Sequence, residues 1–283
     1  MQRTKMVLLC SIVLLMLAAV SVHGQTAAPG TSKPASDSAG RPAPQGDQWE
    51  FRVSPYLWAI QVESKVTVRG YTATVNSYFP DIWRNLEGAG MLNFEAQKGK
   101  LGFFLNPLYM KLRVDGELTR VREPSRPLPP TRDLTLNLTM GVVEFGGFYQ
   151  VAKWPLDWKQ GKGRAVTLDV LGGGRYWYIH MDLDTTSPVN PTKYNDFVDP
   201  IIGIRTRMDL TDKLALNLEG DIGGFGVGSD FTWNAQGSFS YQFTHLISAF
   251  AGYRVLYVDY KAGNDNRFQE TIQGPLGGVT FRF

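Results

Sequence analysis

Apolar and polar residues alternate along most of the chain after residue 48. In residues 231–243 every second residue is apolar or glycine, and the residues between them are Thr, Asn, Gln or Ser. Successive side chains of a β-strand point to opposite faces, so this period of two predicts strands with one apolar and one polar face. Residues 49–58 and 214–222 repeat the pattern, now with charged side chains on the polar face.

The pattern predicts ten strands, and many of them are longer than the five or six residues usual in soluble proteins. Apart from segment 153–164, short turns alternate with longer loops, as in outer-membrane barrels whose longer loops face outward. We therefore predict an all-β fold, a closed antiparallel transmembrane β-barrel that occupies residues 49–283. The strands are expected at 49–60, 90–97, 100–115, 133–152, 165–182, 197–210, 214–224, 231–243, 246–260 and 268–283.

Segment 61–89 has its own organisation within this barrel. Val62–Val68 and Tyr71–Tyr78 alternate on either side of Arg69-Gly70 and predict a β-hairpin, and Asp81–Glu87 predicts one or two helical turns. The segment is expected to be an insertion or a plug in the barrel mouth. If the hairpin itself crosses the membrane, the barrel has twelve strands instead of ten.

Two strands interrupt the alternation. Around Pro107 the apolar face moves from odd-numbered to even-numbered residues, and a similar switch occurs at Val142-Val143. An extra residue in one strand of a pair changes which face a side chain occupies, so both switches are interpreted as β-bulges.

The first 48 residues carry export signals. Arg3 and Lys5 precede an apolar run, and Val22-His23-Gly24 supplies the small residues of a cleavage site, so residues 1–24 are predicted to be a signal peptide. Residues 25–48 are rich in Ala, Pro, Ser and Gly and lack aromatic residues, which predicts a disordered linker. The destination expected for the barrel is the outer membrane.

The composition is that of a membrane barrel more than of a soluble enzyme. Charged residues are 19% and aromatic residues 12% of the chain, and the formal net charge is +3. Such a balance gives no support for a nucleic-acid partner. The one cysteine, Cys10, lies in the predicted signal peptide, and no Cys/His metal motif is present. We therefore expect no cofactor and no bound metal.

Charged residues on the polar faces of the strands are the main functional lead. In a barrel of about ten strands they either pair and fill the interior, or line a small diffusion pore for ions or small solutes. The predicted role is structural or surface-interacting, with a polar and largely filled lumen, and the pore is the alternative. The lumen-lining candidates are Glu50, Arg52, Glu95, Lys111, Arg113, Asp169, Arg175, Arg205, Arg207, Glu219, Asp221 and Arg254.

A rim enzyme is the third and least favoured hypothesis. His180, Asp182 and Asp184 alternate on one face near the expected outer rim, where they could bind a cation or form part of a hydrolytic site. No serine is obviously paired with His180, so a Ser–His nucleophile has no support.

Several motifs make the chain similar to a known family. Gly220–Asp230, Gly252–Tyr260, Gly274–Phe283, Pro55–Trp58 and Arg175–Tyr178 resemble a widespread family of uncharacterised bacterial outer-membrane β-barrel proteins. The resemblance covers most of the predicted barrel. It implies the fold and the location, and it implies no activity.

The C-terminal residues and one charged loop indicate partners. Val279, Phe281 and Phe283 resemble the signal that the outer-membrane assembly machinery reads. Outer-membrane lipid and lipopolysaccharide are the other expected partners, with the charged loop 116–132 available to them. The oligomeric state does not follow from the sequence.

Overall fold

The computed structural model describes residues 48–68, 71–117, 133–156, 164–185, 192–261 and 266–283. The predicted signal peptide and all but the last residue of the predicted linker lie outside these ranges. So does the greater part of the charged loop 116–132.

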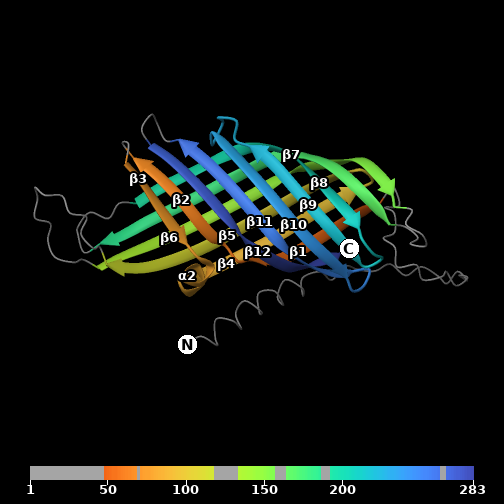
Figure 1. The fold of residues 1–283 in the computed structure, drawn as a ribbon, viewed down its shortest axis with the longest axis horizontal. Helices are drawn as coiled ribbons and strands as arrows, with labels where there is room; N and C mark the ends of the chain where they lie inside the picture. Colours follow the sequence, from red (N-terminus) through yellow and green to blue (C-terminus); the bar gives the residue numbers. More distant parts are fainter. Residues whose placement is uncertain (1–47, 69–70, 118–132, 157–163, 186–191, 262–265) are drawn as a thin grey trace, which may run out of the picture. The chain divides into compact units, whose positions relative to one another are not determined.

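Twelve strands and one short helix make up the described chain (Figure 1). All paired strands are antiparallel, and each of the ten predicted strands is present. The elements are β1 (Trp49–Trp58), β2 (Gln61–Val68), β3 (Tyr71–Ser77), α2 (Phe79–Arg84), β4 (Leu86–Lys98), β5 (Leu101–Glu117), β6 (Asp133–Pro155), β7 (Ala165–Thr185), β8 (Thr192–Asp209), β9 (Leu214–Gly223), β10 (Phe231–Gln242), β11 (Ile247–Lys261) and β12 (Asn266–Arg282).

The sheet closes into a barrel because β1 pairs with both β4 and β12. Ten strands form the closed ring, and β2 and β3 are two additional strands. We call the end with the connections β4–β5, β8–β9 and β10–β11 the turn end. The opposite end, which carries the β5–β6 and β7–β8 connections, is the loop end.

Segment 61–89 forms the predicted hairpin and helix, with the helix at Phe79–Arg84. β2 continues along β12 where β1 leaves it, and β3 pairs with β2. The hairpin backbone therefore extends the barrel wall, and whether the segment also plugs the barrel mouth stays a prediction. Between β1 and β2 the chain passes so close to Gly274 (φ +154°) that a Cβ there would lie 2.0 Å from the Ala59 oxygen. Only glycine fits both the space and the backbone angle at this position.

Both predicted β-bulges are absent, so that interpretation is wrong. The register of β5 and β6 runs without a shift from Leu101↔Tyr149 to Glu117↔Asp133 and includes Pro107↔Val143. Side chains therefore keep their faces throughout, and Leu108 points inward like Phe104. The apolar face changes because the interior changes from polar to apolar, while the strand itself stays regular.

The outer surface of the barrel is apolar. Large side chains such as Phe103 on β5, Ile204 on β8 and Phe239 on β10 are half or more exposed, in alternation with buried neighbours. Rings also stack on the outside near the turn end, where Trp49 lies 6.3 Å from Phe51. In water such a surface would drive aggregation, whereas the acyl chains of a bilayer accommodate it. The wall is therefore that of a transmembrane β-barrel. None of the described helical residues form a helix long and apolar enough to cross a membrane.

The inside of the barrel has an apolar layer nearer the loop end. Its members come from six strands, from Ile60 between β1 and β2, and from α2, whose Ile82 is buried against them. We call this set the apolar layer. It consists of Tyr56, Trp58, Ile60, Ile82, Leu108, Met110, Leu112, Met140, Val142, Trp177, Leu256, Val258, Ile272 and Leu276.

Candidate functional site

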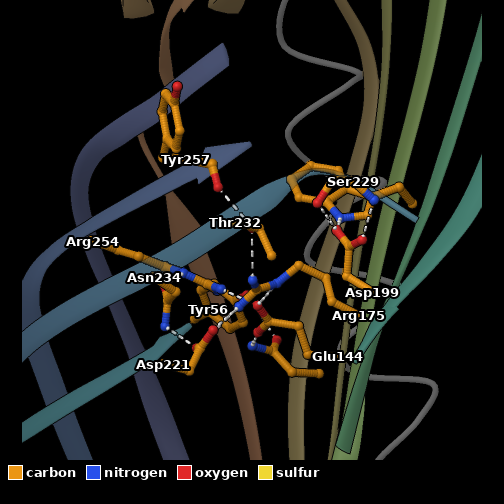
Figure 2. Close-up of polar contacts among 12 residues, drawn as sticks. Tyr56, Glu144, Arg175, Asp199, Asp221, Ser229, Thr232, Asn234, Arg254 and Tyr257 are labelled. Atoms are coloured by element: carbon orange, nitrogen blue, oxygen red, sulfur yellow. Dashed lines mark hydrogen bonds and ion pairs between the residues drawn. The ribbon is translucent and has the colours of Figure 1, made fainter. Parts of the chain in front are cut away.

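Four charged side chains meet in the middle of the barrel. Glu144 (β6), Arg175 (β7), Asp221 (β9) and Arg254 (β11) form what we call the central ion cluster (Figure 2). Arg175 is fully buried; its Nε donates to Glu144 Oε1 at 2.8 Å, and its Nη2 donates to both Asp221 oxygens at 2.8 and 3.0 Å. Arg254 Nη2 donates to the same Glu144 oxygen at 2.6 Å. Two positive and two negative charges balance within the cluster.

Neutral polar groups satisfy the remaining atoms of the cluster. Thr232 accepts from Arg175 Nη1 at 3.1 Å, and Asn234 accepts from Arg254 Nε at 2.8 Å while donating to Asp221 at 3.0 Å. From the other wall, Tyr56 donates to Asn106, which donates to Glu144 at 3.0 Å. The network thus joins strands on opposite sides of the barrel. Buried charges are stable only when paired in this way.

The apolar layer covers the central ion cluster on its loop-end side. Trp177 and Leu256 each lie two residues beyond a cluster arginine on the same strand, and both are only 1% exposed. The Trp58 ring centre lies 5.0 Å from the Arg254 guanidinium carbon, a cation–π distance. Tight apolar packing therefore lies directly above the paired ion network.

A second buried carboxylate fixes the loop between β9 and β10. Asp199 on β8 is fully buried and accepts from Trp177 Nε1 at 3.0 Å, from the Ser229 backbone N–H at 2.6 Å and from the Ser229 hydroxyl at 2.9 Å (Figure 2). The loop contains Phe225 with a positive φ of 50°, a conformation that costs energy for a residue with a side chain. The Asp199 contacts hold this tight loop against β8.

A polar cavity of about 220 Å³ lies on the turn-end side of the central ion cluster. We call it the turn-end cavity. It extends from Glu144 and Tyr56 down to Thr280 and Arg282, near the turn end. Its remaining charged lining residues are Arg52, Glu95, Asp169, Arg205, Arg207 and Glu219, and its neutral polar lining includes Asn217, Gln236, Ser238, Ser240 and Ser248.

Most charges around the turn-end cavity are paired. Glu95 forms ion pairs with Arg205 at 2.9 Å and with Arg52 at 3.1 Å. Asp169 forms an ion pair with Arg205 at 2.8 Å. The Arg205 guanidinium also stacks 3.5 Å from the centre of the Phe148 ring. These contacts fix Arg205 in place, so it forms part of the cavity wall.

The structure places all but two of the predicted lumen residues inside the barrel. Most of them belong to the central ion cluster or line the turn-end cavity, and Glu50 forms ion pairs with Arg52 and Arg282. Lys111 and Arg113 are the exceptions, and their prediction as lumen residues is wrong. They alternate with buried Met110 and Leu112 and therefore point outward. Lys111 pairs with Glu87 at 2.8 Å on the outer surface.

At least four interior charges were not predicted from the sequence, among them Glu270, which is buried on β12. Glu144 joins both cluster arginines, Asp199 holds the β9–β10 loop, and Arg282 lines the cavity. Glu144 lies four residues before Phe148 on the same strand, so regular alternation places both side chains on the inner face. The bulge predicted at Val142-Val143 concealed this signal, because a bulge changes which face the residues near it occupy. For Asp199 the signal was its parity with Arg205 and Arg207 on the same strand, which were both predicted to face inward. Its contact with Ser229 gave no signal, because Ser229 is distant in the chain.

The predicted rim site is only partly within the described residues. His180 is partly buried, and its Nδ1 lies 3.3 Å from the Tyr178 hydroxyl. The side chains of Asp182 and Asp184 fall outside the described set, so the rim site stays a prediction. Among the described residues no group of three or more His, Cys, Asp or Glu side chains is arranged to hold a metal ion.

No protein-family model and no curated protein matches the chain. Solved structures of outer-membrane β-barrels do match it in outline. They include Ail, the attachment invasion locus protein of Yersinia pestis, solved with the heparin analogue sucrose octasulfate (9% identity, TM-score 0.33, covering 84% of this chain and 99% of Ail). The translocator domain of autotransporter NalP from Neisseria meningitidis has 14% identity and a TM-score of 0.41, covering 85% of this chain and 91% of that domain. The outer membrane protease OmpT from Escherichia coli has 9% identity and a TM-score of 0.34, covering 87% of this chain and all of OmpT. These three proteins differ in role and resemble the chain remotely, so no function is transferred from them.

Proposed function

We propose that this protein is a non-conducting outer-membrane β-barrel with a structural or surface-interacting role. The barrel would be closed across its middle by the central ion cluster and the apolar layer. Its interior would then communicate with one side of the membrane only, through the turn-end cavity.

The observation that carries the proposal is the complete pairing of the central ion cluster. Arg175 is 0% exposed, and both of its charged partners have further hydrogen-bond partners of their own. An ion that crossed the barrel would have to displace these contacts and then pass the apolar layer without water. Both steps are costly, since unpaired charges and dry apolar constrictions oppose conduction.

Location and partners belong to the same proposal. The apolar exterior, the alternating turns and loops and the predicted signal peptide support an outer-membrane location with the loop end outside the cell. Lipid and lipopolysaccharide would contact the wall, and the assembly machinery would read Val279, Phe281 and Phe283. Membership of the uncharacterised barrel family named above is a prediction of the same kind.

The experiment is single-channel recording on the refolded protein, residues 49–283, in a planar bilayer. Heat-modifiable gel migration first confirms that the barrel is folded, and a general porin recorded in the same bilayers shows that insertion is detectable. We expect no discrete current steps. Reproducible steps whose ion selectivity changes in Arg205→Ala or Arg207→Ala would instead identify the small diffusion pore and refute the proposal.

A further inference from the structure

One carboxylate of the turn-end cavity lacks a partner. Glu219 on β9 lies between Arg205 on β8 and Gln236 on β10 in the sheet, and it lines the cavity. Within the described part of the chain it makes no hydrogen bond and no ion pair, whereas Glu95 and Asp169 in the same wall both bind Arg205. A charge inside a protein is costly unless something pairs with it. Glu219 therefore offers a site for a positive group.

Unused donors lie nearer the turn end of the same cavity. Arg282 forms an ion pair with Glu50 through its Nε at 3.2 Å, without a hydrogen bond, and among the described residues its two Nη groups have no acceptor. Arg207 Nε donates to Asp209 at 3.0 Å and its Nη1 donates to Asn217 at 3.5 Å, and no acceptor for its Nη2 is found in the described part of the chain. These guanidinium groups offer a site for a negative group, and arginine is well suited to bind a carboxylate through two N–H groups.

The two sites are separated by the length of a small molecule. Arg207 is the register partner of Asn217, and Glu219 lies two residues further along the same face of β9. Two residues of a strand span about 7 Å. The wall between and opposite them is neutral and polar, with Gln236, Ser238 and other amide and hydroxyl groups. A volume of about 220 Å³ accommodates a small organic molecule in place of several waters.

We propose that the turn-end cavity binds a small zwitterion of the amino-acid type, with its ammonium group at Glu219 and its carboxylate at Arg207 and Arg282. A zwitterion pairs both unsatisfied sites at once and adds no net charge to the barrel. A simple cation or a simple anion leaves one of the two sites unpaired. The inference deepens the proposed closed barrel, because a solute that cannot pass the central ion cluster is held in the cavity.

The test compares three probes that differ by one group each. L-serine carries an ammonium group, a hydroxyl and a carboxylate; ethanolamine lacks the carboxylate, and glycerate has a hydroxyl in place of the ammonium. Binding to the refolded barrel in micelles is measured by saturation-transfer NMR and titration. We expect L-serine to bind at least tenfold more tightly than either analogue. Equal affinity for L-serine and ethanolamine, or no binding of any of the three probes to folded protein, would overturn the proposal.

Two variants locate the site. Glu219→Gln keeps the size of the side chain and removes the charge, so the affinity for L-serine should fall at least tenfold. The matched control Glu87→Gln removes a carboxylate from the outer surface and should leave the affinity unchanged. An unchanged affinity in Glu219→Gln would show that serine binds elsewhere. Bilayer current steps with serine binding retained would refute only the closed barrel, whereas silence without serine binding would refute only this inference.

Discussion

Replacing Arg175 with methionine tests whether the central ion cluster holds the barrel together. Methionine is close to arginine in length and fills most of its volume, so the loss is mainly one of charge and hydrogen bonds. Asp221 would lose both of its bonds to the guanidinium and retain only Asn234. Glu144 would keep Arg254 and Asn106.

The expected loss of stability follows from the hydrogen bonds that Asp221 loses and Glu144 keeps. Removal of one partner from a buried ion pair costs about 3–5 kcal/mol, because the other charge stays behind in a medium that solvates it poorly. Arg175→Met should therefore lower the free energy of unfolding by about that amount, with most of the loss arising at Asp221. The double variant Arg175→Met/Asp221→Asn removes the orphaned charge and should recover part of the loss.

The assay is equilibrium unfolding in urea with the barrel refolded into lipid vesicles, followed by tryptophan fluorescence. Lys111→Met is the control, because it removes a charge from an exposed pair on the outside of β5. Its unfolding midpoint should match that of the unmodified protein. If Arg175→Met behaves like the control, or if the double variant is no more stable than the single one, the cluster does not stabilise the barrel as argued.

Three further expectations concern other parts of the barrel. A Cβ at Gly173 would lie 2.0 Å from a carbonyl oxygen on β6, so Gly173→Ala should destabilise the barrel by about 1–3 kcal/mol in the same unfolding assay, whereas Gly90→Ala, with open space around it, should cost little. Asp199→Ala removes the acceptor of three hydrogen bonds, and chymotrypsin should then cleave loop 224–230 in folded protein; continued resistance would show that the loop is held otherwise. Phe283→Ala should reduce the amount of barrel assembled in the outer membrane of cells while refolding in detergent is little changed, and unchanged assembly would remove Phe283 from the predicted signal.

The strands could be predicted because a period of two is a local property. In residues 231–243 the polarity of each side chain indicates which face of the strand it occupies, so the strand can be predicted without knowing its partner strand. The hairpin in 61–89 was visible for the same reason. Its place in the wall was not, because the pairing of β2 with β12 depends on residues far along the chain.

The interior was harder to predict, because alternation gives parity but does not say which parity faces inward. Polar residues face inward around the turn-end cavity, and apolar residues face inward in the apolar layer. The rule that polar means inward therefore worked for Arg205 and failed for Lys111 and Arg113, although all three lie on regular strands. A single rule for the whole barrel would be correct only if the interior were uniform along its axis.

The pairing of β1 with β12 also constrains how the protein can be made. Phe51 and Phe283 exchange two backbone hydrogen bonds across this seam, at 2.9 and 3.1 Å, although almost the whole barrel sequence separates them. Contacts between such distant residues form slowly, because the intervening chain must be ordered first. Until the seam forms, β1 and β12 have unpaired edges that can pair with another chain. We therefore expect the step that joins the first strand of the barrel to its last to limit the rate of folding.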